Sequence, residues 1–172
     1  AGADLLHMDD PSLNVAATAW GGCYCVHCKE KAAKAGKTVQ DIQRSSTDEF
    51  YRDLREQFAA HARRHVPFSC NNYSGDPGFP MGHFDFGLAE LPESASTPQR
   101  IHGMLRAMEA AGKAQVFTFV SKQVPLTRRV IASAYAAGGH VLVPWDVYVA
   151  TGIPRYFGTP SEYADLYGFV RA

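Results

Sequence analysis

Residues 96–120, STPQRIHGMLRAMEAAGKAQVFTFV, contain the pattern of a helix, a short connection and a strand, in that order. Thr97 is placed to cap the helix, and Pro98 would occupy its first position, where a missing N–H has no cost. Apolar side chains then recur at helical spacing until Gly112, which favours a helix end. The apolar run 115–120 has the length of a strand. This stretch therefore predicts a helix–strand unit of an α/β fold.

The same order of elements recurs along the chain. Ser46, with Glu49 three residues later, matches a capping box, so we expect a helix from there to about Arg64. Further apolar runs of strand length are more continuous than alternating, which is typical of parallel strands covered on both faces. The expected strands lie within residues 4–10, 68–74, 83–91, 115–120 and 140–148. We therefore predict an α/β fold of parallel strands alternating with helices.

The expected domain organisation is simple. At 172 residues the chain is long enough for one domain with a real core, so we predict a single domain over residues 1–172. A cysteine-rich loop, residues 11–46, would be inserted after the first strand. The chain starts almost directly in an apolar run, so we expect further sequence upstream, and its N-terminus predicts no localisation.

Charge and hydropathy exclude two classes of partner. The sequence has 17 basic and 17 acidic residues, so its formal net charge is zero, and nucleic-acid binding needs a net or clustered positive field. The densest basic cluster, Arg63, Arg64 and His65, is interpreted as the end of a helix, where cations offset the last carbonyl groups. No apolar run approaches the roughly 18 residues that span a bilayer. We therefore expect neither a nucleic-acid nor a membrane partner.

Polar residues gather where the expected strands end. In a parallel α/β sheet or barrel, the carboxyl ends of the strands share one edge, and binding sites are built there. A single acid at such a position could be a cap or a turn residue, but the asymmetry recurs at every strand. These residues are Asp9, Asp10, Asn71, Asn72, Glu90, Ser121, Lys122, Trp145 and Asp146.

Two of these carboxylates predict glycoside chemistry. Asp10 precedes Pro11, which favours an extended backbone at Asp10, and this would direct the Asp10 side chain into the mouth of the site. Glu90 ends another strand. A glycosidase needs one acid to protonate the leaving oxygen and a second carboxylate to attack or to activate water. We assign these roles to Asp10 and Glu90. The alternative is that Glu90 is a salt-bridge partner and that the neighbouring Asp9 is a cap.

Other residues at this edge suit a sugar. Trp145 could stack on the apolar face of a sugar ring, or could fill the core instead. Asn71, Asn72 and Asp146 could accept or donate hydrogen bonds to sugar hydroxyls, and Asp9 would orient the substrate. The expected ligand is therefore a carbohydrate.

The most unusual chemical feature is Cys23-Tyr24-Cys25-Val26-His27-Cys28, a C-x-C-x-x-C pattern. Three thiolates on one tight loop favour a structural zinc site, which needs four ligands. Cys70, His27 or a residue outside this sequence could supply the fourth. The alternatives are disulfide-paired or unligated thiols, or a catalytic cysteine, which would need a histidine partner. We expect no organic cofactor.

The acidic strand end followed by CYCVHCKEKAAKAG resembles the zinc-binding β-galactosidases of glycoside hydrolase family forty-two, over residues 4 to 35. The resemblance implies a (β/α)₈ barrel, of which this chain would hold about strands four to eight, and an acid/base at the end of strand four. The family has Asn-Glu there, whereas this chain has Asp9-Asp10-Pro11, and 115–122 lacks the family's nucleophilic Glu. Only the three cysteines and, loosely, Asp10 therefore carry over.

These observations predict a glycoside hydrolase-like, carbohydrate-active protein. The alternative is a non-catalytic sugar-binding or assembly module formed by a half-barrel with another chain. A metal-dependent hydrolase would need histidines at strand ends, and His7, His83 and His140 do not lie there. Five strands cannot close an eight-stranded barrel, so we expect another chain or a missing N-terminal half to complete it.

Overall fold

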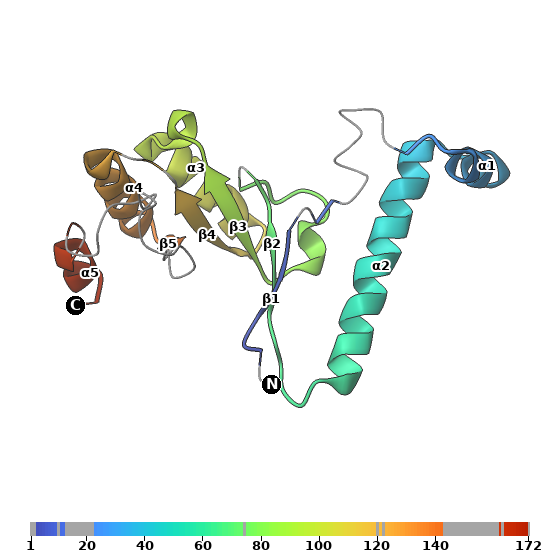
Figure 1. Cartoon of the computed structure of the whole chain (residues 1–172), viewed down its shortest axis with the longest axis horizontal. Helices are drawn as coiled ribbons and strands as arrows, with labels where there is room; N and C mark the ends of the chain where they lie inside the picture. Colours follow the sequence, from blue (N-terminus) through green and yellow to red (C-terminus); the bar gives the residue numbers. More distant parts are fainter. Residues whose placement is uncertain are drawn as a thin grey trace, which may run out of the picture. The chain divides into compact units, whose positions relative to one another are not determined.

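The computed structural model describes residues 3–9, 11–12, 23–73, 75–119, 121, 123–142, 162 and 164–171. Its strands form a parallel sheet in the order β1-β2-β3-β4-β5 (Figure 1). The α/β fold class is therefore confirmed, whereas the TIM-like barrel and the single domain over 1–172 stay predictions. The elements are β1 (Leu6–Met8), α1 (Val26–Ala35), α2 (Val39–His61), β2 (Phe68–Asn71), η2 (Met81–His83), β3 (Phe86–Leu91), η3 (Glu93–Ala95), α3 (Pro98–Ala110), β4 (Ala114–Phe119), α4 (Val124–Ala136), β5 (His140–Leu142) and α5 (Ala164–Arg171).

The chain divides into two compact units. Unit 1 comprises residues 1–71 and 78–85, and unit 2 comprises residues 72–77 and 86–172. Unit 1 holds β1, β2, α1, α2 and η2, and unit 2 holds the remaining elements. Each unit is described by itself below.

Helix α2 begins earlier than the sequence pattern predicts. Thr38 is its N-cap: the Thr38 hydroxyl accepts from the Asp41 N–H, and the Asp41 carboxylate accepts from the Thr38 N–H. The expected capping box at Ser46 and Glu49 is therefore wrong, and Ser46 lies inside a continuous helix (Figure 1). The Thr38 and Asp41 pair and the Ser46 and Glu49 pair both match a capping box. Only a start at Thr38 makes residues 39–46 helical, and this part of the helix contains buried Ile42 and Gln43.

The interval 11–46 is correspondingly not one loop. Helix α1 occupies Val26–Ala35 and ends at Gly36, whose positive φ of 61° allows the chain to turn. Helix α2 then starts at Val39. The predicted insertion is therefore helical over much of its described length, because its Ala- and Lys-rich segment has high helix propensity. None of the described helices is both long and apolar enough to span a membrane.

The core of unit 1 joins α2 to β2 and η2. Tyr51 of α2 is almost fully buried and makes an edge-to-face contact with Phe84, with ring centroids 4.9 Å apart. Phe58, also in α2, packs edge-to-face on Phe68 of β2 at 5.3 Å. Cys70, on the same strand, is fully buried beside Met81. One side of β2 is thereby fixed against α2 and η2.

The core of unit 2 lies between one face of its strands and helices α3 and α4 (Figure 1). Ala89 and Leu91 of β3 and Phe117 and Phe119 of β4 are buried there. Each helix contributes an apolar stripe, and that of α3 is predicted by its sequence. Their buried residues in this cluster are Ile101, Leu105, Val130, Ile131 and Ala134.

The opposite face of β3 and β4 is less covered. Burial alternates along both strands, so Leu88, Glu90 and Thr118 are half-buried or exposed. The expectation that both faces of these strands are covered therefore does not hold in the described part of the chain.

Candidate functional site

Three cysteines form the clearest chemical cluster in the described residues. The sulfur atoms of Cys23, Cys25 and Cys28, called the cysteine group below, lie within 4.8 Å of one another. In a tetrahedral zinc site with Zn–S bonds of about 2.3 Å, sulfur atoms are about 3.8 Å apart, so the group needs little adjustment to bind an ion. All three thiols are free of disulfide bonds. The cysteine group could therefore hold a metal ion.

The local fold explains why these thiols converge. Cys25 is the N-cap of α1, and Cys28 lies in the first turn, so the helix brings the two side chains to the same side. Gln43 of α2 donates a hydrogen bond of 3.1 Å to the Cys23 carbonyl oxygen. This bond holds the segment that precedes α1 against α2. Gln43 is buried, although the sequence pattern gave no sign of this role.

The thiols interact electrostatically. Although Cys25 makes no side-chain hydrogen bond of capping geometry, the nearby Cys28 backbone N–H is the main cause of a lowered pKa of the Cys25 thiol. Neighbouring Cys25 and Cys23 raise the pKa of Cys28 to about 11. Three thiolates so close together repel one another unless a cation lies between them. A bound divalent ion would remove that repulsion.

Cys70, the predicted fourth ligand, does not belong to the cysteine group. It is fully buried in β2, and its Sγ lies 3.7 Å from the Met81 Sδ. His27 is exposed at the start of α1 and is also outside the group. Among the described residues, the cysteine group therefore supplies three candidate ligands.

A second polar feature lies on β1 and β2. The strands are paired so that His7 lies opposite Ser69, and the His7 Nδ1 is 2.8 Å from the Ser69 hydroxyl. One step further, the Asn71 Nδ2 donates to the Asp9 carboxylate at 3.1 Å. Because side chains alternate along a strand, these four lie on the face opposite Cys70. We call this pair of cross-strand contacts the polar ladder.

The polar ladder ends at the carboxyl edge of its strands, where the sequence predicts a site. Asp9, which follows β1, is exposed, and Asn71, the last residue of β2, is buried. Both were predicted as substrate-binding residues, and the structure brings them together. His7 and Ser69 were not predicted. The regular alternation of polar residues at 7 and 9 and at 69 and 71 is the signal that could have found them.

The other predicted site residues divide into three groups. Glu90 is exposed near the carboxyl end of β3, on its open face. Asn72 is buried instead: its amide exchanges two hydrogen bonds with the Gln115 amide, at 2.8 and 3.1 Å, in the interior of unit 2. This placement commits Asn72 to the core. Asp10, Trp145 and Asp146 lie outside the described residues.

Comparisons with known proteins identify no family. No family model matches the chain, and no curated protein matches it. The resemblance to glycoside hydrolase family forty-two therefore stays a prediction.

Proposed function

We propose that this chain is a carbohydrate-active protein of the glycoside hydrolase type, built on part of a TIM-like barrel. The observation that supports the proposal best is the polar ladder. It aligns imidazole, hydroxyl, carboxylate and amide groups along one strand face, up to the edge where α/β proteins bind ligands. Within this row, exposed His7 and Asp9 could hydrogen-bond to sugar hydroxyls, while buried Ser69 and Asn71 hold them in place.

The proposed chemistry uses two carboxylates. Asp10 directly follows the polar ladder in sequence and would be the acid/base, while Glu90, exposed on its strand, would be the second carboxylate. Asp9 would orient the substrate from its contact with Asn71. Trp145 and Asp146 remain proposed substrate contacts on sequence grounds alone.

The test is hydrolysis of a panel of aryl glycosides. Glu90→Gln and Asp10→Asn should each lower turnover by orders of magnitude with little change in stability, because the lost interactions are made in the transition state. Glu109→Gln is the matched control, since Glu109 is an exposed glutamate on α3 paired with Arg106. Full activity in Glu90→Gln would refute the catalytic assignment. Saturable sugar binding without turnover would favour the non-catalytic sugar-binding module.

We also propose that the cysteine group binds zinc in a structural role. The ion would fix the segment before α1 to the first turn of that helix and take no part in sugar chemistry. Purified chain should carry about one zinc, and chelation should lower its melting temperature. Cys25→Ser should do the same. Metal-free protein of undiminished stability would contradict this role.

The same measurement identifies the fourth ligand. Cys70→Ala and His27→Ala are compared for zinc content and for the visible spectrum after cobalt substitution, which reports the number of thiolates. Cys70→Ala should leave both unchanged, because its thiol packs against Met81. Loss of zinc in that variant would show that Cys70 moves to the metal.

Assembly is the third part of the proposal. Within the described residues, β1 and β5 are the two edge strands of the sheet. Exposed strand edges pair readily with other strands, so another chain or a missing N-terminal half would complete the barrel. Sedimentation of this chain alone should therefore show self-association, and a compact, stable monomer would contradict the proposal.

A further inference from the structure

A cavity of about 700 Å³ lies in unit 1, at the end opposite the polar ladder. It is formed by the residues that precede β1, the last turn of α2 and the connection to β2. This volume is within the range of small-molecule sites. The residues that line it are Ala3, Phe58, His61, Ala62, Arg63, Arg64 and Val66.

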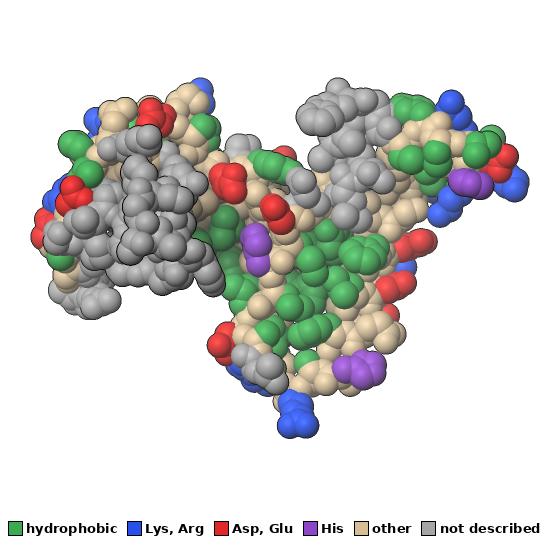
Figure 2. All heavy atoms as spheres, in the orientation of Figure 1, with side chains coloured by type: hydrophobic (Ala, Val, Ile, Leu, Met, Phe, Trp, Pro, Cys, Tyr) green, Lys and Arg blue, Asp and Glu red, His purple; other side chains and the backbone are tan. Residues whose placement is uncertain are grey.

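The wall of the cavity is mainly hydrophobic. Val66 is buried, Phe58 and Ala62 are half-buried, and hydrophobic side chains gather on the face between β1 and α2 (Figure 2). A neighbouring cavity of about 410 Å³ shares several of these residues and extends the same surface toward Phe68. Apolar walls with few polar groups are typical of sites for small organic ligands.

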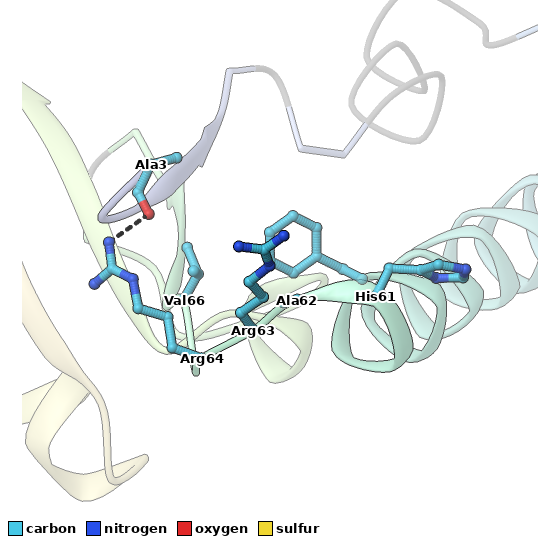
Figure 3. Close-up of a pocket in the computed structure, with 7 residues that line it drawn as sticks. Ala3, His61, Ala62, Arg63, Arg64 and Val66 are labelled. Carbon is cyan, nitrogen blue, oxygen red and sulfur yellow. Dashed lines mark hydrogen bonds between the residues drawn. The ribbon is translucent and has the colours of Figure 1, made fainter. Parts of the chain in front are cut away.

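The two arginines at the cavity differ. Arg64 donates to the Ala3 carbonyl oxygen at 3.0 Å and forms an ion pair with Asp4, so it ties the segment before β1 in place. Arg63 makes no hydrogen bond or ion pair with any residue that the structure describes. Figure 3 shows Arg64 directed to Ala3, whereas the Arg63 side chain extends separately from that contact and His61 is directed away.

None of the described residues that line the cavity is acidic, so none of them can neutralise Arg63. Asp4 is paired with Arg64, and Asp85 is paired with Arg55, which lines the neighbouring cavity. The His61 Nδ1 lies 2.7 Å from the Gln57 carbonyl oxygen. Within the part of the chain that the structure describes, the Arg63 guanidinium therefore has no counter-charge and lies beside a hydrophobic wall.

We propose that this cavity binds a small organic anion, a carboxylate with an apolar body. The carboxylate would pair with Arg63, whose planar guanidinium matches its two oxygen atoms. The apolar body would lie against Phe58, Ala62 and Val66. This site is independent of the proposed sugar chemistry, because it lies at the amino ends of β1 and β2 and the polar ladder lies at their carboxyl edge.

The probe is 4-phenylbutyrate, titrated into the purified chain by calorimetry. The neutral amide of the same acid and plain acetate are the two comparison ligands. We expect saturable binding of 4-phenylbutyrate, with both comparison ligands at least tenfold weaker, because charge-assisted hydrogen bonds and hydrophobic contact are both needed. Equal binding of the amide, or no saturable binding of the acid, would overturn the proposal.

Variants then test the residues. Arg63→Gln should weaken binding of the acid at least tenfold and leave the amide unchanged. Arg52→Gln is the matched control, since Arg52 is exposed on α2 and lies away from the cavity lining. Ala62→Leu should place a larger side chain where the apolar body would lie and weaken binding at least tenfold, while the circular dichroism spectrum stays the same. Unchanged affinity in Arg63→Gln would refute the site, as would self-association that buries Arg63 and excludes the ligand.

Discussion

Replacing Asp85 should destabilise unit 1 strongly, although Asp85 has no part in the proposed chemistry. Its carboxylate accepts a hydrogen bond of 2.7 Å from the Phe68 N–H, and its own N–H donates to the Phe68 carbonyl oxygen at 2.8 Å. The two Nη atoms of Arg55 each lie 3.3 Å from the carboxylate. Asp85 thus joins the start of β2 to helix α2.

The cost of removing the carboxylate can be estimated from these contacts. A hydrogen bond to a charged group contributes about 1.5–3 kcal/mol. The ion pair with Arg55 adds at most about 1 kcal/mol, because both side chains are about one third exposed, at 34% and 33%. Asp85→Ala should therefore destabilise the chain by about 2–4 kcal/mol. Asp85→Asn, which keeps an acceptor for the Phe68 N–H, should cost about 1 kcal/mol.

Urea denaturation followed by circular dichroism measures this difference. With a slope of about 2 kcal/mol per M, Asp85→Ala should lower the midpoint by about 1–2 M. Asp53→Ala is the control, because Asp53 is 68% exposed on α2 and should change stability by less than about 0.5 kcal/mol. If Asp85→Ala and Asp53→Ala had the same stability, the assignment of Asp85 as a structural link would be refuted.

The same residue predicts a pH dependence. Partial burial by itself would raise the pKa of Asp85, but the hydrogen bond from Phe68 and the Arg55 guanidinium outweigh it, so its pKa is lowered in the folded protein. A carboxylate with a lowered folded-state pKa stabilises the fold at pH values above its unfolded-state pKa of about 3.9. This stabilisation is lost as the pH falls through the folded-state pKa. Asp85→Asn should therefore lose less stability than the wild type on acidification below about pH 4.

Three further predictions test the packing. Gly87→Ala should destabilise the chain by about 1–3 kcal/mol, because a Cβ would lie 2.3 Å from the Asn72 amide nitrogen. Gly103→Ala on α3 should stabilise it by up to about 1 kcal/mol, because a Cβ there would have no atom within 4 Å. Thermal unfolding compares the two variants. In chelator-treated protein, a thiol reagent should modify exposed Cys25 fastest, because its thiol pKa is lowered, and Cys28 more slowly, because its pKa is raised to about 11. Cys70 should react only after denaturation, because it is fully buried. Burial raises the pKa of Tyr51 to about 12, so Tyr51→Phe should remove one late-ionising tyrosine from an alkaline absorbance titration.

Local sequence determined much of the secondary structure. Helix α3 begins and ends close to the predicted positions, because Thr97 and Pro98 specify its start, and the chain turns at Gly112 with a φ of 69°. The start of α2 was mispredicted, since two capping patterns compete and the burial of Ile42 and Gln43 favours the earlier one. The sequence also did not predict the alternation of buried and half-buried residues in β3 and β4, because half-buried Leu88 is as apolar as its buried neighbours.

The candidate site was predictable only where its residues are neighbours in sequence. Cys23, Cys25 and Cys28 lie within six positions, so a single helix start brings them together and the sequence alone indicates a metal site. Cys70 could not be placed this way, because a thiol serves equally as ligand or core residue, and only packing against Met81 decides between them. The polar ladder likewise exists only because the register of β1 and β2 sets residues 62 positions apart side by side. Contacts between distant residues depend on this pairing, which local patterns do not encode.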